Sequence, residues 1–120
     1  MARILLIDDE EALLRLLGVV LHRHGHVVVA SATAREGLNL LRADSTIGAA
    51  VLDMSLPDMS GAAALDEIFS IAPHLPVLVA SGSPVCREDL RLDPGRKVGF
   101  LQKPFPPRAL LEALDELMPS

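Results

Sequence analysis

The sequence predicts an α/β domain built on a five-stranded parallel sheet. Three observations predict this class: five short apolar runs without polar alternation, segments of helical period between them, and enough apolar residues for one core. The chain has 120 residues, of which 50% are hydrophobic. A chain of this length and composition can bury a core without disulfides or metals. We therefore expect a single domain over residues 1–120.

Five apolar runs mark the predicted strands. Because none of them alternates apolar with polar residues, each is predicted to be buried on both faces, as the strands of a parallel sheet are. In chain order the runs are residues 4–7 (ILLI), 27–30 (VVVA), 49–52 (AAVL), 77–80 (VLVA) and 98–101 (VGFL).

Apolar stripes of helical period follow four of the five runs. They extend over residues 13–21, 34–41, 62–72 and 110–118. Pro106 and Pro107 stand where the first turn of the last helix would begin. In the remaining connection, residues 83–97, Pro84 and the turn around Pro94 leave room for about two helical turns. We therefore expect five helices, the fourth short or irregular, on both faces of a doubly wound sheet with right-handed crossovers.

Polar side chains follow four of the five predicted strands. Asp8 and Asp9 follow the first, Asp53 the third, Ser81 the fourth and Lys103 the fifth. Ligands of open parallel sheets bind beyond the carboxyl ends of the strands, next to the point where the strand order reverses. The second strand ends in ASAT, without a charge. This pattern predicts the flavodoxin-like strand order 2-1-3-4-5, with the second strand at an edge.

Three carboxylates at one sheet end need compensating positive charge. Lys103 supplies one positive charge, and the remainder predicts a divalent cation. Oxygen ligands favour Mg²⁺ or Mn²⁺ over zinc, which prefers His and Cys. A hard cation, an ammonium and the hydroxyl of Ser81 together suit a phosphoryl group. Asp53 is the best candidate nucleophile, since it lies between the acid pair and the lysine.

The stretches RILLIDDE, VLDMSLPDMSG and GFLQKPF, taken in this order, resemble the receiver domains of two-component response regulators, the chemotaxis receiver among them. The resemblance extends over essentially the whole chain. The stretch GFLQKPF is also similar to the corresponding stretch of receivers attached to hybrid histidine kinases. An excised receiver of such a kinase is therefore an alternative to a free-standing protein.

The resemblance implies a role for each polar residue. Asp53 would be the phosphoacceptor, Asp9 would bind Mg²⁺ directly, and Asp8 would act through a metal-bound water. The backbone carbonyl of Ser55 would complete the protein ligands. Apart from the resemblance, helix capping and the helix dipole predict that Glu10 and Glu11 serve the first helical turn.

Four further residues have counterparts in the family. Ser81 matches the hydroxyl residue that turns toward the phosphoryl group, in place of the commoner threonine, and Lys103 matches the lysine that contacts it. Pro104 follows that lysine, and the bond before it is a candidate cis peptide. Phe100 takes the position of the switch aromatic but lacks a phenol hydroxyl. Switching would therefore change the burial of the ring, without a hydrogen bond from it. A short fourth helix would alter the usual output face, formed by helix four, strand five and helix five.

The expected function is that of a signalling phosphoacceptor. Asp53 would receive a phosphoryl group from a histidine kinase or a histidine phosphotransfer protein, with Mg²⁺-dependent self-phosphorylation from phosphodonors and self-dephosphorylation. A small Mg²⁺-dependent phosphohydrolase that forms an aspartyl phosphate is an alternative, although Ser55 stands where such enzymes of the haloacid dehalogenase type carry a second acid. A nucleotide-binding module is disfavoured because the sequence lacks the glycine-rich motifs that bind phosphates. An adaptor that acts without phosphorylation would not need the acceptor, the acid pair, the hydroxyl and the lysine all to be present.

Composition narrows the partners further. The net charge of -5, with no Trp or Tyr and only three Phe, disfavours direct nucleic-acid binding. No apolar run reaches the roughly 18 residues that a membrane span needs. The single cysteine, Cys86, and the absence of a signal-peptide pattern favour a cytoplasmic location. We expect a monomer or weak homodimer acting on a downstream protein that the sequence does not identify.

Overall fold

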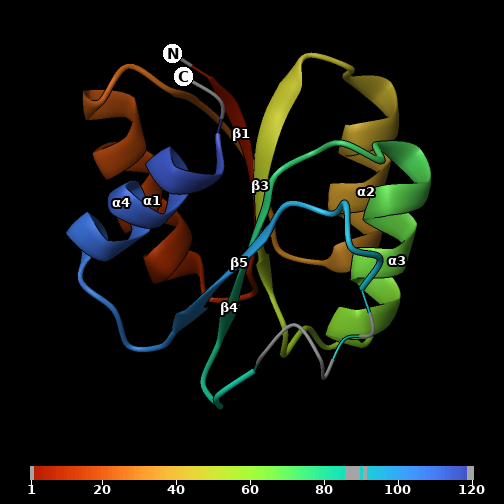
Figure 1. Cartoon of the computed structure of the whole chain (residues 1–120). Coiled ribbons are helices and arrows are strands. Elements are labelled where there is room, and N and C mark those ends of the chain that lie inside the picture. Colours follow the sequence, from red (N-terminus) through yellow and green to blue (C-terminus); the bar gives the residue numbers. More distant parts are fainter. Residues whose placement is uncertain (1, 86–89, 91, 119–120) are drawn as a thin grey trace.

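The computed structural model describes residues 2–85, 90 and 92–118 and contains a five-stranded parallel sheet (Figure 1). The sheet has the order β2-β1-β3-β4-β5, which confirms the predicted flavodoxin-like order. The elements are β1 (Arg3–Ile7), α1 (Glu11–Arg23), β2 (Val27–Ser31), α2 (Ala34–Ala43), β3 (Ile47–Asp53), α3 (Gly61–Ile71), β4 (Val77–Ser81), β5 (Val98–Gln102) and α4 (Pro107–Leu117).

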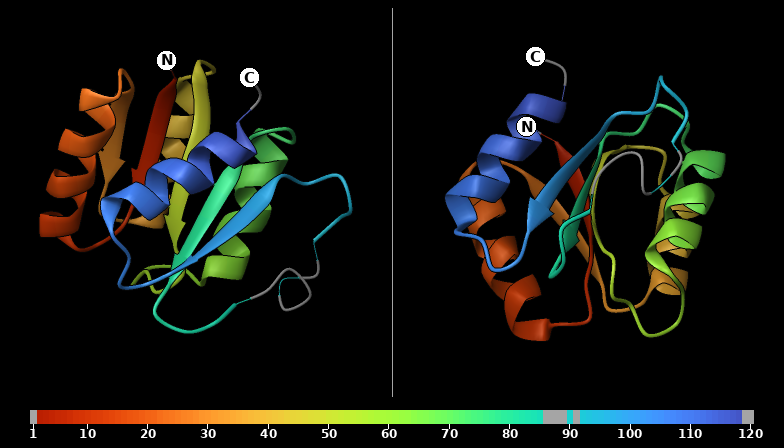
Figure 2. Two further views of the ribbon diagram at one scale, coloured as in Figure 1. Left: turned by 60° about the vertical axis from the view of Figure 1, so that its left-hand side comes forward. Right: turned by 60° about the horizontal axis from the view of Figure 1, so that its bottom comes forward.

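Helices cover both faces of the sheet, with α1 and α4 on one side and α2 and α3 on the other (Figures 1 and 2). Side chains along a strand point alternately to the two faces. In β1, Leu5 and Ile7 pack in the core beneath α2 and α3, whereas Ile4 and Leu6 pack beneath α1 and α4. This double burial explains why the strand sequences are continuously apolar.

The described residues contain four helices, where the sequence predicted five. The predicted fourth helix falls on residues 83–97, of which 86–89 and 91 lie outside the described residues. The described flanks, residues 82–85 and 92–97, contain no α-helix. Pro84 and Pro94 account for this, because proline lacks the N–H that a helix interior requires.

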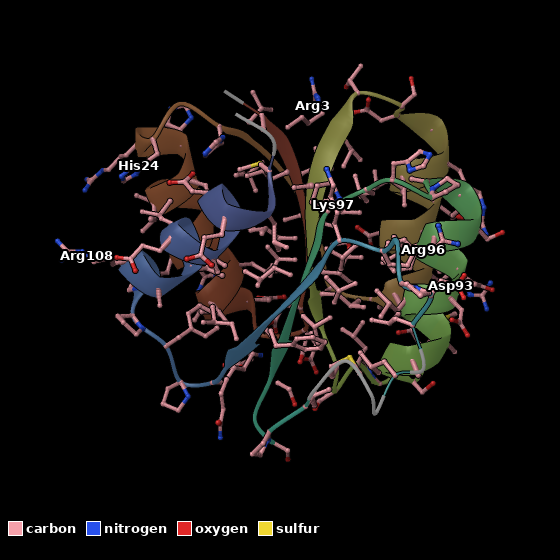
Figure 3. The ribbon with its side chains drawn as sticks, viewed as in Figure 1. Arg3, His24, Asp93, Arg96, Lys97 and Arg108 are labelled. Carbon is pink, nitrogen blue, oxygen red and sulfur yellow. The ribbon has the colours of Figure 1, made fainter. Side chains whose placement is uncertain are left out.

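Arg96, at the end of the connection between β4 and β5, contacts α3 and the residues that follow it (Figure 3). Its Nη1 donates to the backbone carbonyl of Pro73 at 2.9 Å. Its guanidinium also lies 5.1 Å from the centre of the Phe69 ring, a cation–π distance. Leu92 packs against the same core. These contacts thus hold the described end of the connection, residues 92–97, against α3.

The loop after β3 is held in place by side chains that cap two helices. The carboxylate of Asp58 accepts the N–H groups of Ala34 and Arg35, at 3.0 Å each, at the start of α2. These hydrogen bonds keep the pKa of Asp58 below its usual value. Ser60 caps α3 by accepting the N–H of Ala63 at 3.2 Å. The loop that begins at Asp53 is therefore anchored on α2 and α3.

Gly61, the first residue of α3, packs directly against Met54, the residue after Asp53. A Cβ at position 61 would lie 3.0 Å from the Cα of Met54 and closer still to its sulfur. We therefore expect Gly61→Ala to lower the free energy of unfolding by about 1–3 kcal/mol. Gly18 in α1 is the control, because a Cβ there meets no atom within 4 Å. Urea denaturation should show Gly18→Ala more stable by about 0.5–1 kcal/mol, and equal effects at both positions would contradict the packing argument.

Within the described residues, no helix combines the length and apolar character needed to cross a bilayer.

Candidate functional site

Because all strands of the sheet are parallel, the carboxyl ends of β1, β3, β4 and β5 lie at the same end of the sheet. Asp8 follows β1, Asp53 ends β3, Ser81 ends β4 and Lys103 comes shortly after β5. The ends of β4 and β5 are joined there, since the N–H of Lys103 donates to the carbonyl of Ser81 at 2.7 Å. The residues that the sequence placed at separate strand ends therefore share one site.

Three carboxylates form the acidic part of the site. Each of Asp8, Asp9 and Asp53 offers an oxygen within 4.8 Å of the other two. Asp53 and Asp8 are buried, with 3% and 7% of their surfaces exposed, whereas Asp9 is exposed. Closely spaced carboxylate oxygens with one side open to solvent are the donor set of a hard divalent cation that keeps some of its water. The cluster can therefore hold a metal ion.

Backbone N–H groups orient two of these carboxylates. The Oδ1 of Asp8 accepts the N–H of Glu10 at 2.9 Å, and the Oδ1 of Asp53 accepts the N–H of Ser55 at 3.1 Å. Both are hydrogen bonds to the residue two positions later, the local geometry that short acidic side chains favour. Ser55 thus lies directly beside the acceptor carboxylate.

Lys103 is the cation of the site. Its Nζ lies 2.8 Å from Asp8 Oδ2, 3.2 Å from Glu10 Oε1 and 3.5 Å from Asp53 Oδ1. Burial by itself would lower the pKa of Lys103, but the hydrogen bond to Asp8 and the surrounding carboxylate charges outweigh it and raise that pKa. The side chain therefore carries its positive charge at neutral pH.

For the carboxyl of Asp53 the effect of burial is the opposite, and burial raises its pKa. The hydrogen bond from Ser55 and the charge of Lys103 act in the opposite direction, and the charges of Asp8 and Asp9 add to the increase. A raised pKa means that the folded domain binds this proton more tightly than the unfolded chain does. Without metal, stability should therefore fall as pH rises from the unfolded pKa, about 3.9, through the raised folded value.

Asp53→Asn removes this pH-dependent loss. At pH 7 without divalent cations we expect the variant to melt at a higher temperature than the parent, because it has no buried carboxylate to keep ionised. The difference should shrink at about pH 3.5, where the unfolded chain also protonates Asp53. Thermal melts at both pH values, with the exposed Asp66→Asn as control, measure this. A variant less stable than the parent at pH 7 would contradict the burial argument.

Ser81 and Phe100 lie on the β4–β5 side of the site. Ser81 is buried, and its Oγ accepts the N–H of Ser83 at 3.1 Å. Phe100 is half-buried and packs against the core beneath α3. A cavity of about 160 Å³ has both Ser81 and Phe100 in its lining. The Lys103–Pro104 peptide bond is cis, the geometry that the resemblance implied for it.

Glu10 is the residue whose place in the site the sequence did not reveal. It is the N-cap of α1, yet its side chain makes no capping hydrogen bond and contacts Lys103 instead. The expected role in the first helical turn is thus not fulfilled by a capping hydrogen bond from the Glu10 side chain. Glu11 does lie in that turn and pairs with Arg15 at 4.0 Å.

The chain matches the family model described as the response regulator receiver domain over residues 4–115. Among curated proteins it is 29% identical to the transcriptional regulatory protein GlrR of Escherichia coli, over 98% of this chain and 26% of that protein. It is 27% identical to the chemotaxis protein CheY of Thermotoga maritima, over 96% of both chains. The chain spans about a quarter of the length of the first of these relatives.

Solved structures show the same fold. A receiver domain protein from Methanospirillum hungatei has a TM-score of 0.85 at 31% identity, over 97% of this chain and 92% of that one. A response regulator from Burkholderia pseudomallei has a TM-score of 0.82 at 26% identity, over 95% of this chain and 66% of that one. The latter structure contains a phosphorylated aspartic acid, a calcium ion and citrate.

Proposed function

This chain belongs to the family of response regulator receiver domains, and from that premise we propose that Asp53 is the residue that accepts the phosphoryl group. Receiver domains are the phosphoacceptors of two-component signalling. Neither the family match nor the relatives favour the alternative of a small phosphohydrolase. We take residues 1–120 as one receiver domain, either free-standing or part of a longer regulator or hybrid kinase.

One observation carries the assignment to Asp53. Its carboxylate is 3% exposed, has an oxygen within 4.8 Å of each of the other two acids, and lies 3.5 Å from the ammonium of Lys103. A buried carboxylate held next to positive charge is suited to attack phosphorus, because the charge on the phosphoryl oxygens is neutralised as the bond forms. The phosphorylated aspartic acid of the Burkholderia relative supports the same chemistry.

The proposed transfer starts from a phosphohistidine of a histidine kinase or phosphotransfer protein. A carboxylate oxygen of Asp53 attacks phosphorus, an O–P bond forms, and the N–P bond of the histidine breaks, so that the imidazole keeps the electron pair. Lys103 donates to a phosphoryl oxygen, and Ser81 supplies a hydroxyl donor. Acetyl phosphate would serve as a small donor for self-phosphorylation, and attack of water on phosphorus would return Asp53.

Mg²⁺, or Mn²⁺ in its place, would be held by Asp9 and Asp53 directly, by Asp8 through water and by the backbone carbonyl of Ser55. When bound, it would neutralise phosphoryl oxygens during transfer. The three carboxylate oxygens within 4.8 Å of one another and the exposed side at Asp9 support this assignment. The calcium ion of the Burkholderia relative is a hard cation of the same class.

The conformational response would pass through Ser81 and Phe100. Attraction of the Ser81 hydroxyl to the phosphoryl group would change the cavity that both residues line, and the Phe100 ring would move further into it. Phosphorylation would then shift the population between two arrangements of the β4–β5 side. The downstream protein would bind to the surface on the β4–β5 side and distinguish these two arrangements. We further propose a cytoplasmic monomer or weak homodimer without direct nucleic-acid contact from this domain.

Incubation with Mg²⁺ and acetyl phosphate, followed by intact mass spectrometry, tests the proposal. The parent should gain one phosphoryl group, and Asp53→Asn should gain none. Asp58→Asn is the matched control, because this nearby carboxylate binds the amides of α2 and should leave labelling intact. Absence of an adduct on the parent, or equal labelling of Asp53→Asn, would overturn the assignment.

A further inference from the structure

Glu10 contacts Lys103 in the site, although Glu10 itself belongs neither to the metal cluster nor to the residues of the transfer step. Its Oε1 lies 3.2 Å from Lys103 Nζ, and its side chain is 62% exposed. Lys103 is more enclosed, with a side chain that is 17% exposed. The contact joins the start of α1 to the end of β5, 93 residues away in sequence. It is therefore a tertiary ion pair inside the site.

The three carboxylates around Lys103 are not equally close. Asp8 and Glu10, both after β1, accept from Nζ at 2.8 and 3.2 Å, whereas Asp53 lies 3.5 Å away. The ammonium is thus held toward the β1 side. A phosphoryl group on Asp53 would bring further negative charge and would need the same ammonium. Glu10 and the phosphoryl group therefore compete for Lys103.

We propose that Glu10 is a positioning residue for Lys103, which holds the ammonium on the β1 side until a phosphoryl group on Asp53 draws it away. This inference rests on the proposed function. It follows that Glu10 restrains phosphorylation in two ways. It retains the cation that the phosphoryl group needs, and its own charge repels an anionic donor.

Glu10→Gln removes the charge with little change in shape, and Glu11→Gln is the matched control. Glu11 is adjacent in sequence and its side chain is 81% exposed, but its partner is Arg15 on the surface of α1. At saturating Mg²⁺, Glu10→Gln should be phosphorylated by acetyl phosphate about two- to fivefold faster than the parent, the range that partly exposed ion pairs produce. Glu11→Gln should match the parent. High salt should reduce the difference.

A readout without metal or phosphodonor is available because the chain has only two lysines, Lys97 and Lys103. Figure 3 shows Lys97 just before β5, so it reports from the end of the sheet opposite the site. In metal-free protein with ¹³C-labelled lysine, Glu10→Gln should shift the Lys103 Cε signal and increase the mobility of that side chain. The Lys97 signal should not change, and Glu11→Gln should change neither signal.

Addition of Mg²⁺ and beryllofluoride, a phosphoryl mimic, tests the release step. The Lys103 signals of parent and Glu10→Gln should then converge, because the ammonium has left Glu10 in both. Three results would overturn the proposal: an unchanged metal-free Lys103 signal in Glu10→Gln, a difference that persists with beryllofluoride, or slower phosphorylation of the variant. If the parent takes no phosphoryl group at all, the proposed function fails and the release step with it. A metal-free shift confined to Glu10→Gln would then show that the ion pair alone stands.

Discussion

Chelation of divalent cations should slow phosphorylation of Asp53 by acetyl phosphate about a hundredfold or more. The reason is electrostatic. Asp8, Asp9 and Asp53 have oxygens within 4.8 Å of one another, and among the described residues Lys103 is the cation that contacts Asp8 and Asp53. Without a metal ion the incoming phosphoryl group meets a site of net negative charge. A bound cation contributes several kcal/mol of charge stabilisation in the transition state, and each 1.36 kcal/mol corresponds to about tenfold in rate.

The rate of labelling should be followed by intact mass at several Mg²⁺ concentrations and in excess EDTA. Asp9→Asn should raise the Mg²⁺ concentration needed for half-maximal rate, and because Asp9 is exposed the substitution should leave the fold unchanged. Asp66→Asn, on the outer surface of α3, controls for the general loss of a negative charge. A parent rate that is equal in EDTA and in Mg²⁺ would show that the acidic cluster does not act through a cation.

Replacement of Lys103 by Met should have the second-largest effect. Removal of one preorganised donor from a site of developing negative charge lowers rates by about a hundredfold, and we expect a loss of that order at saturating Mg²⁺. The variant should also be less stable without metal, by about 2 kcal/mol, because Asp8 and Asp53 are left buried without their cation.

The two effects of Lys103→Met should respond differently to Mg²⁺. Mg²⁺ replaces the missing positive charge and should restore most of the stability. It cannot replace the ammonium donor, so the rate should stay low. Lys97→Met is the control, because Lys97 is exposed just before β5 and should affect neither quantity. A Lys103→Met variant with the parent rate would remove Lys103 from the mechanism, whatever its stability.

The sheet and most of the site could be predicted because both follow from simple rules. Runs such as residues 49–52 are apolar on both faces, and in a parallel sheet that pattern arises from helices on each side. Because the strands are parallel, their carboxyl ends lie at the same edge of the sheet. The sequence alone therefore predicts that Asp53 and Lys103, 50 positions apart, belong to one site.

The parts that sequence reasoning missed depend on tertiary contacts. Local rules place Glu10 at a helix start, where acids are favoured. Its side chain is mostly exposed and contacts a nearby cation instead, and that cation, Lys103, directly follows β5. The same limit applies to the connection before β5. Its prolines exclude a regular helix in the described flanks, while the packing of its described end depends on Arg96, which contacts Phe69 of α3 and the carbonyl of Pro73 just after α3.

Chemical trapping of the acyl phosphate tests the central claim most directly. Borohydride reduces an aspartyl phosphate to homoserine, so protein labelled with acetyl phosphate and Mg²⁺ can be reduced, digested and mapped by peptide mass spectrometry. We predict homoserine at position 53, dependent on Mg²⁺ and absent from unlabelled protein. Homoserine at Asp8 or Asp9, or no conversion in protein that carries a phosphoryl group, would contradict the assignment of Asp53 as the phosphoacceptor.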